Sequence, residues 1–230
     1  MHRPARPYPV QERLLIPAQS EPASAPPRQS WLGPPLRSLT QPEFDAACAQ
    51  LMRVVERDYR PTLIVGVRTG GLAVAESMAR HASAAAPVLP VTSRRASTDA
   101  KSRIPLLRVA LGALPRPTAN LLRRVEHRLL IASRSHHQRQ QLIDHGEVAA
   151  IADWLTQRTL PSRVLVADDA VDSGVTLTTV VRHIAAACPP HTDIRTAVIT
   201  QTLEEPVMQP DYCLFQNTLC RFPWSFDARP

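Results

Sequence analysis

Three aspartates and a hydroxyl-bearing loop stand together in the stretch VADDAVDSGVT, residues 166–176. Asp168 and Asp169 follow an apolar run, Asp172 comes three residues later, and SGVT (residues 173–176) leads into a helical pattern. Hydroxyl donors, a glycine that lets the backbone approach closely and the positive end of a helix together suit a phosphate monoester. Carboxylates suit sugar hydroxyls, or a Mg²⁺ that bridges to phosphate oxygens. The stretch therefore predicts a ribose at the acids and its 5′-phosphate at the loop.

A second polar turn, RTGG at residues 68–71, follows the β-rich run TLIVGV and precedes the helical pattern that starts at Leu72. In an open parallel sheet, ligands bind beyond the carboxyl ends of the strands. Both turns are expected at such ends, so they are candidates for one shared site.

The elements that must position these turns alternate between strand and helix. Thr40 to Glu43 matches a capping box and starts a helix expected to run to about Arg57. Further strands are expected in PVLPVTS, in the apolar run RVLVA before the polar turn DDAVDSGVT, and in IRTAVIT, with helices in GEVAAIADWLTQR and after SGVT. Near-continuous apolar strands alternating with helices predict an α/β fold, with a Rossmann-like parallel sheet and helices on both faces.

The expected domain organisation is one domain over residues 39–230, preceded by a Pro-rich, disordered leader over residues 1–38. A long interruption at about 93–145 contains helical patterns and is too long for an ordinary connection, which predicts a lid or helical insertion. Its basic residues are lid candidates: Arg94, Arg95, Lys101 and Arg103. Residues from about 203 to 230 are expected to form a small C-terminal hood, as the resemblance described below implies.

The stretch VLVADDAVDSGVTL resembles the signature of type I phosphoribosyltransferases, and LIVGVRTGGL resembles the pyrophosphate loop of the same family. The two motifs occur in the family's order, and with the intervening lid they cover roughly residues 62–200. The resemblance implies that Asp168 and Asp169 contact the ribose hydroxyls of phosphoribosyl pyrophosphate (PRPP) and its Mg²⁺, and that Asp172 assists proton transfer beside the acceptor. It also implies a 5′-phosphate loop of Ser173, Gly174, Val175 and Thr176, and a pyrophosphate loop, often with a cis peptide bond, of Arg68, Thr69, Gly70 and Gly71.

Many members of the family carry a basic residue directly before the paired glycines, whereas Thr69 stands there in this chain and Arg68 comes one position earlier. The ending FPW is similar to that of some purine phosphoribosyltransferases, which makes Phe222 and Trp224 base-stacking candidates. The implied reaction moves the 5-phosphoribosyl group of PRPP to a nucleobase, with purine favoured and pyrophosphate released. The expected assembly is a homodimer.

Composition keeps an alternative class open. The formal net charge is +7 and the sequence pI is about 10.0, which favours an acidic partner. A regulator of the same fold that senses PRPP or a nucleotide and binds nucleic acid is the second hypothesis, and an enzyme with a non-salvage acceptor is the third.

Four cysteines without metal-ligand spacing and the lack of a membrane-length apolar run predict a cytoplasmic protein without membrane contact. An Arg-rich, acid-poor start leaves an organelle transit peptide as the alternative.

Overall fold

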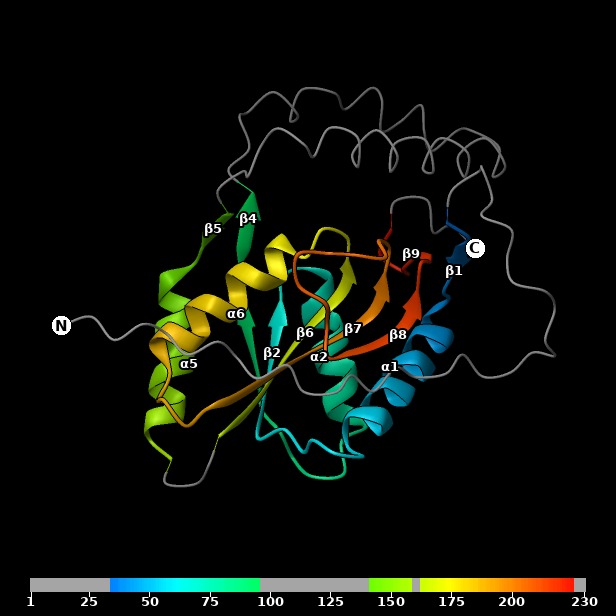
Figure 1. Ribbon diagram of the computed structural model, residues 1–230. Coiled ribbons are helices and arrows are strands. Elements are labelled where there is room, and N and C mark those ends of the chain that lie inside the picture. The colour runs from blue at the N-terminus through cyan, green and yellow to red at the C-terminus, as the bar shows by residue number, and fades with distance from the viewer. Residues whose placement is uncertain (1–33, 96–140, 159–161, 226–230) are drawn as a thin grey trace.

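The computed structural model describes residues 34–95, 141–158 and 162–225 (Figure 1). Five strands form a parallel sheet in the order β3-β2-β6-β7-β8. The elements are β1 (Leu36–Ser38), α1 (Gln41–Val55), β2 (Leu63–Val67), α2 (Gly70–Arg80), β3 (Val88–Val91), β4 (Ser93–Arg95), β5 (Gln141–Ile143), α5 (His145–Thr156), β6 (Arg163–Val171), α6 (Val175–Ala187), β7 (Asp193–Gln201), β8 (Tyr212–Gln216) and β9 (Leu219–Arg221). The expected Rossmann-like sheet is confirmed.

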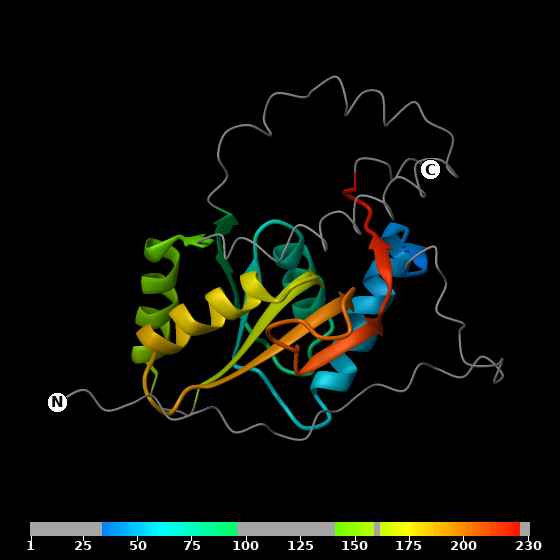
Figure 2. The same ribbon diagram turned by 45° about the horizontal axis from the view of Figure 1, so that its top comes forward.

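Helices cover both faces of the sheet, with α1 and α2 on one side and α5 and α6 on the other (Figures 1 and 2). Each face of the sheet has its own hydrophobic core, and alternate residues of the central strands point into one core or the other. Leu165 and Ala167 of β6 pack with α1 and α2, whereas Val164 and Val166 pack with α5 and α6. Within the described part of the chain, no helix is long and apolar enough to cross a membrane.

The N-terminal helix begins as the sequence predicts. The Glu43 carboxylate accepts hydrogen bonds from the Thr40 backbone N–H at 2.8 Å and from the Thr40 hydroxyl at 2.7 Å. These backbone and hydroxyl hydrogen bonds also hold the pKa of Glu43 below its ordinary value.

Regular secondary structure is already present before residue 39, where the domain was expected to begin. Leu36–Ser38 forms β1 and pairs in parallel with β9, Leu36 opposite Leu219 and Ser38 opposite Arg221. The expectation that these residues belong to a disordered leader was wrong, because a strand partner more than 180 positions away leaves no trace in local composition. The rest of the leader, residues 1–33, lies outside the described residues.

A short antiparallel ribbon of β4 and β5, with Ser93 opposite Ile143, lies at the two ends of the segment expected to form the insertion. Arg94 is exposed on this ribbon. The other lid candidates, Lys101 and Arg103, and the rest of residues 96–140 lie outside the described residues.

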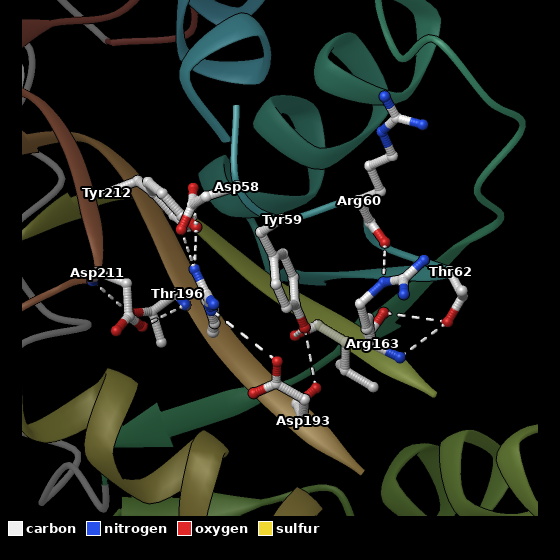
Figure 3. Close-up of polar contacts among 11 residues, drawn as sticks. Asp58, Tyr59, Arg60, Thr62, Arg163, Asp193, Thr196, Asp211 and Tyr212 are labelled. Carbon is white, nitrogen blue, oxygen red and sulfur yellow. Dashed lines mark hydrogen bonds and ion pairs between the residues drawn. The ribbon is translucent and has the colours of Figure 1, made fainter. Parts of the chain in front are cut away.

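A group of polar side chains ties the elements together at the amino ends of the strands, opposite the two motif loops (Figure 3). The hydroxyl of Tyr59, which is 1% exposed, donates to the carbonyl oxygens of Val164 and Asp193, each at 2.9 Å. Tyr59 follows α1, whereas the two carbonyls belong to β6 and β7. One buried hydroxyl therefore connects the end of a helix to two neighbouring strands.

A more exposed triad lies beside it. The Arg195 guanidinium donates to the Asp58 carboxylate and to the Tyr212 oxygen, both at 2.5 Å, and the Tyr212 hydroxyl donates to Asp58 at 2.9 Å. The Arg195 guanidinium also lies over the Tyr59 ring, 4.5 Å from its centroid.

Tyr59→Phe is expected to lower the free energy of unfolding by roughly 1–3 kcal/mol, because two buried carbonyls lose their donor. Tyr212→Phe should lower it less, since the ion pair between Arg195 and Asp58 survives. Urea unfolding followed by circular dichroism measures both. Equal losses, or a larger loss for Tyr212→Phe, would contradict this ranking.

Candidate active site

The two motif loops meet at the carboxyl edge of the sheet, toward which the arrowheads of β2, β6 and β7 point (Figure 1). Strand β2 pairs with β6 only as far as Gly66 opposite Ala167, and α2 then begins at Gly70. Strand β6 continues along β7 until Val171 lies opposite Gln201. Asp168 and Asp169 are therefore inside an extended strand, not in the turn after it that the sequence suggested, because β7 alone sustains the pairing.

Glycines bring the RTGG loop directly onto the acids. A Cβ atom on Gly70 would lie 1.9 Å from Oδ2 of Asp169, and one on Gly71 would lie 2.8 Å from Oδ1 of Asp168. A larger residue at Gly70 would displace the Asp169 carboxylate, and one at Gly71 would also collide with the Ala167 carbonyl oxygen at 2.6 Å and the Asp168 Cα at 2.7 Å. The two glycines of one motif are thus required by the two acids of the other.

The peptide bond between Arg68 and Thr69 is cis, as the resemblance implies for this loop. The Arg68 side chain turns to α5, where its Nη2 lies 3.1 Å from Oε1 of Glu147. The other Glu147 oxygen accepts the Thr92 backbone N–H at 2.5 Å. An Arg68 contact with pyrophosphate stays a prediction, and the part of this loop that faces the acids is its glycine backbone.

Two negative charges on the neighbouring side chains of Asp168 and Asp169 are unfavourable in the ligand-free protein. Burial is the main reason that the pKa of Asp168 lies well above its ordinary value, and the neighbouring Asp169 charge raises it further. Burial also raises the pKa of Asp169, while hydrogen bonds, including those from the side chains of Asp168 and Trp224, oppose the rise. The Asp169 backbone N–H donates to Oδ1 of Asp168 at 2.9 Å.

A divalent cation fits this donor set. The buried carboxylate of Asp168 and the half-buried one of Asp169 are hard oxygen ligands, and a cation would offset their repulsion. Within the described ranges, however, no three His, Cys, Asp or Glu side chains form a metal-binding group. Asp168 and Asp169 would therefore hold Mg²⁺ together with ligand or water oxygens.

The expected phosphate loop has the backbone its sequence requires. Gly174 adopts φ +77°, a left-handed conformation that favours glycine, and α6 begins at the next residue. A Cβ on Gly174 would lie 2.7 Å from the Met208 backbone nitrogen. The Val207 backbone N–H donates to the Ser173 carbonyl oxygen at 2.8 Å, so the segment after β7 supports this loop from behind.

The third acid has a partner that no sequence motif indicates. Oδ1 of Asp172 accepts a hydrogen bond from the Thr202 hydroxyl at 2.5 Å. Thr202 directly follows β7, and its only sequence signal is its place after the apolar strand. The sequence analysis missed this residue.

The C-terminal FPW segment forms a small aromatic cluster. The rings of Phe222 and Trp224 stack at a centroid distance of 5.0 Å, and both meet the Phe44 ring edge-on. Phe222 is 4% exposed and belongs to the core, whereas Trp224 is 42% exposed. Of the two base-stacking candidates, only Trp224 has substantial exposed surface.

These features define a Rossmann-like α/β protein with a candidate site at the carboxyl edge of its parallel sheet. A family model for the phosphoribosyl transferase domain matches residues 37–228. The chain belongs to this family, and it is an enzyme of the phosphoribosyltransferase kind. No curated protein sequence matches it.

Solved structures share the fold at low identity. A purine phosphoribosyltransferase from Pyrococcus horikoshii is 19% identical, with a TM-score of 0.51 over 83% of this chain and 94% of that one. A xanthine-guanine-hypoxanthine phosphoribosyltransferase from Helicobacter pylori is 15% identical, with a TM-score of 0.51 over 84% and 95%. A hypothetical protein from Neisseria gonorrhoeae with bound ppGpp is 13% identical, with a TM-score of 0.53 over 83% and 89%.

Asp168→Asn is expected to stabilise the ligand-free protein at neutral pH, because the amide removes a buried charge next to Asp169. The raised native pKa of Asp168 means that the acid favours folding when protonated and opposes it once ionised. The gain in the free energy of unfolding should therefore be absent below the ordinary pKa of 3.8. It should grow at higher pH and be complete once the pH has risen through the native pKa of Asp168.

Thermal unfolding at several pH values measures this effect. Asp153→Asn is the matched control, since it removes the same charge from an exposed position on α5. A stabilisation by Asp168→Asn that is the same at pH 3 and pH 8, or that Asp153→Asn reproduces, would contradict the assignment of a raised pKa to Asp168.

Proposed function

We propose that the chain transfers the 5-phosphoribosyl group of PRPP to a nucleobase and releases pyrophosphate, with a purine as the favoured acceptor. The observation that carries this proposal is the fit of Gly70 and Gly71 against Asp169 and Asp168. That fit joins the pyrophosphate-loop motif to the ribose motif at one edge of the sheet, and a transferase that binds both ends of PRPP requires this arrangement.

Each group then has a defined task. Asp168 and Asp169 accept hydrogen bonds from the ribose hydroxyls. Residues 173–176 bind the 5′-phosphate with hydroxyls, backbone N–H groups and the positive end of α6. Residues 68–71 bind the pyrophosphate, principally through the backbone at the start of α2. Mg²⁺, when bound with PRPP, neutralises charge on the leaving pyrophosphate.

The reaction breaks the bond between C1′ and the pyrophosphate oxygen and forms a bond from C1′ to a ring nitrogen of the base. Positive charge develops on the sugar, and the ring nitrogen gives up its proton to Asp172. The buried position of Asp168 supports charge stabilisation without much competition from water. Trp224 is the proposed stacking surface for the base, and Phe222 supports it from the core.

The first experiment is a calorimetric titration of PRPP with and without Mg²⁺, followed by a panel of purine and pyrimidine bases in the same cell. The expected result is PRPP binding that requires Mg²⁺, and heat of turnover on addition of one base. Binding without turnover of any base would favour an acceptor outside nucleobase salvage or the regulator, and the absence of PRPP binding would overturn the proposal.

A regulatory role of the same fold, in which the protein senses PRPP or a nucleotide and binds nucleic acid, is the second candidate beside the enzymatic one, and the sequence pI of about 10.0 favours it. A nucleic-acid shift that weakens steeply with salt would support this class, since phosphate contacts release counterions. Asp172 favours the enzyme, because a protein that only senses PRPP has no need of a carboxylate beside the acceptor. We also propose the cytoplasm as the location, and the four free cysteines support a reducing compartment.

Asp169→Asn is expected to weaken PRPP binding, because an amide is a poorer acceptor for ribose hydroxyls and a poorer metal ligand. Asp172→Asn should leave the PRPP dissociation constant nearly unchanged and lower kcat by about 10²- to 10⁴-fold, the usual contribution of a general base. Titration and steady-state kinetics separate the two effects. Asp153→Asn serves as the charge control, and equal, negligible effects of both site variants would remove the assigned roles.

A further inference from the structure

We propose that Thr202 is a positioning residue that orients the Asp172 carboxylate toward the acceptor. The inference rests on the proposed function, because Asp172 needs a defined orientation only if it accepts a proton there. Thr202 comes from the segment that follows β7, whereas Asp172 follows β6. Thr202 would therefore act across two neighbouring strands.

Two contacts fix the pair. The Thr202 backbone N–H donates to the carbonyl oxygen of Val171 at 2.9 Å, which extends the pairing of β6 and β7 by one step. The Thr202 hydroxyl donates to Oδ1 of Asp172 at 2.5 Å. Val171 directly precedes Asp172 in the chain. Thr202 therefore holds both the backbone next to the acid and the carboxylate of the acid itself.

The hydroxyl proton has one well-placed acceptor. Oγ1 of Thr202 lies 3.5 Å from the Val171 carbonyl oxygen, at the limit of a hydrogen bond, and a carboxylate is the stronger acceptor. Thr202 is 7% exposed, so water has little access to compete for this proton. Threonine is also stiff about its first side-chain bond, which makes the direction of the hydroxyl definite.

A buried threonine within β7 shows what a purely structural hydroxyl does. Thr200 is 0% exposed, and its hydroxyl donates to the Thr218 carbonyl oxygen at 2.7 Å and the Phe215 carbonyl oxygen at 3.2 Å. Those contacts hold the turn between β8 and β9. Thr202, two residues later, instead directs its hydroxyl to the one acid that the proposed mechanism uses for proton transfer.

The segment that Thr202 begins supports the next two residues of the motif as well. Val207 donates its backbone N–H to the Ser173 carbonyl oxygen, and the Met208 backbone packs against Gly174. Residues 202–208 thus contact Asp172, Ser173 and Gly174 in turn. One continuous segment would set the acid and the phosphate loop in a fixed relation.

Orientation matters for the proposed proton transfer, because a base must lie within hydrogen-bond reach of the proton it takes. With Oδ1 held by Thr202, the direction of the whole carboxylate is set before the acceptor arrives. Loss of the hydroxyl leaves the acid present but removes the hydrogen bond that sets the direction of Oδ1. The effect should fall on kcat, with little change in PRPP binding.

The test compares Thr202→Val and Thr202→Ser with Thr200→Val by steady-state kinetics on the base that the calorimetric panel identifies. We expect Thr202→Val to lower kcat by about 10- to 100-fold, with the KM for PRPP within about twofold of wild type. Thr202→Ser should restore most of the rate, since serine retains the donor. Thr200→Val should lose thermal stability but keep the wild-type kcat.

A double-mutant cycle tests whether the effect passes through Asp172. In the Asp172→Asn background, Thr202→Val should change kcat by less than about twofold. An undiminished effect of Thr202→Val in that background would overturn the inference, as would a wild-type kcat for Thr202→Val alone or a failure of serine to restore the rate. If Thr202→Val does not fold, Thr202→Ala replaces it, because alanine removes the hydroxyl without placing a methyl group against the Asp172 carboxylate.

The two proposals fail in different ways. A wild-type protein that turns over no base on the panel would remove the proposed function, and the inference would fall with it. A wild-type protein that turns over a base, combined with unchanged kcat in both Thr202→Val and Thr202→Ala, would overturn the inference alone.

Discussion

A buried and a half-buried carboxylate stand side by side in the last part of β6, and two glycines of the loop after β2 lie directly against them. Burial and mutual repulsion raise the pKa of Asp168, so the pair opposes folding once both acids are ionised. A cation and a polyhydroxyl ligand would relieve this repulsion. The ligand-free fold therefore stores an unfavourable interaction at the point where the proposed substrate would bind.

The rest of the fold must offset the unfavourable free energy of this acid pair. The parallel sheet does so, because separate helix pairs bury its central strands on both faces. A polar cluster lies at the opposite edge, where the Tyr59 hydroxyl donates to two strand carbonyls and Arg195, Asp58 and Tyr212 hydrogen-bond one another. Groups that stabilise the domain and groups proposed for chemistry thus lie at opposite ends of the same strands.

The chain after β7 links the motif of residues 168–176 to the aromatic FPW segment. Thr202 contacts Asp172, Val207 and Met208 lie against Ser173 and Gly174, and the later FPW segment packs Trp224 on Phe222 and Phe44. In the family to which the chain belongs, the reaction joins a phosphorylated sugar to an acceptor. A C-terminal segment that contacts the proposed sugar-phosphate motif and also carries the proposed base-stacking residue is suited to align the two substrates.

The amino-acid sequence by itself determined the α/β class, the order of the central elements and the two loops, since apolar strands, glycine turns and the capping box at Thr40 are local patterns. It also indicated Asp168, Asp169 and Asp172 through their spacing. Only the tertiary structure decided that β6 continues through the acid pair, that β1 pairs with β9, and that Arg68 pairs with Glu147. The Thr202 contact with Asp172 and the burial of Phe222 belong to the same group. Each of these depends on residues distant in the chain, and such contacts form only when the whole sheet brings the strands together.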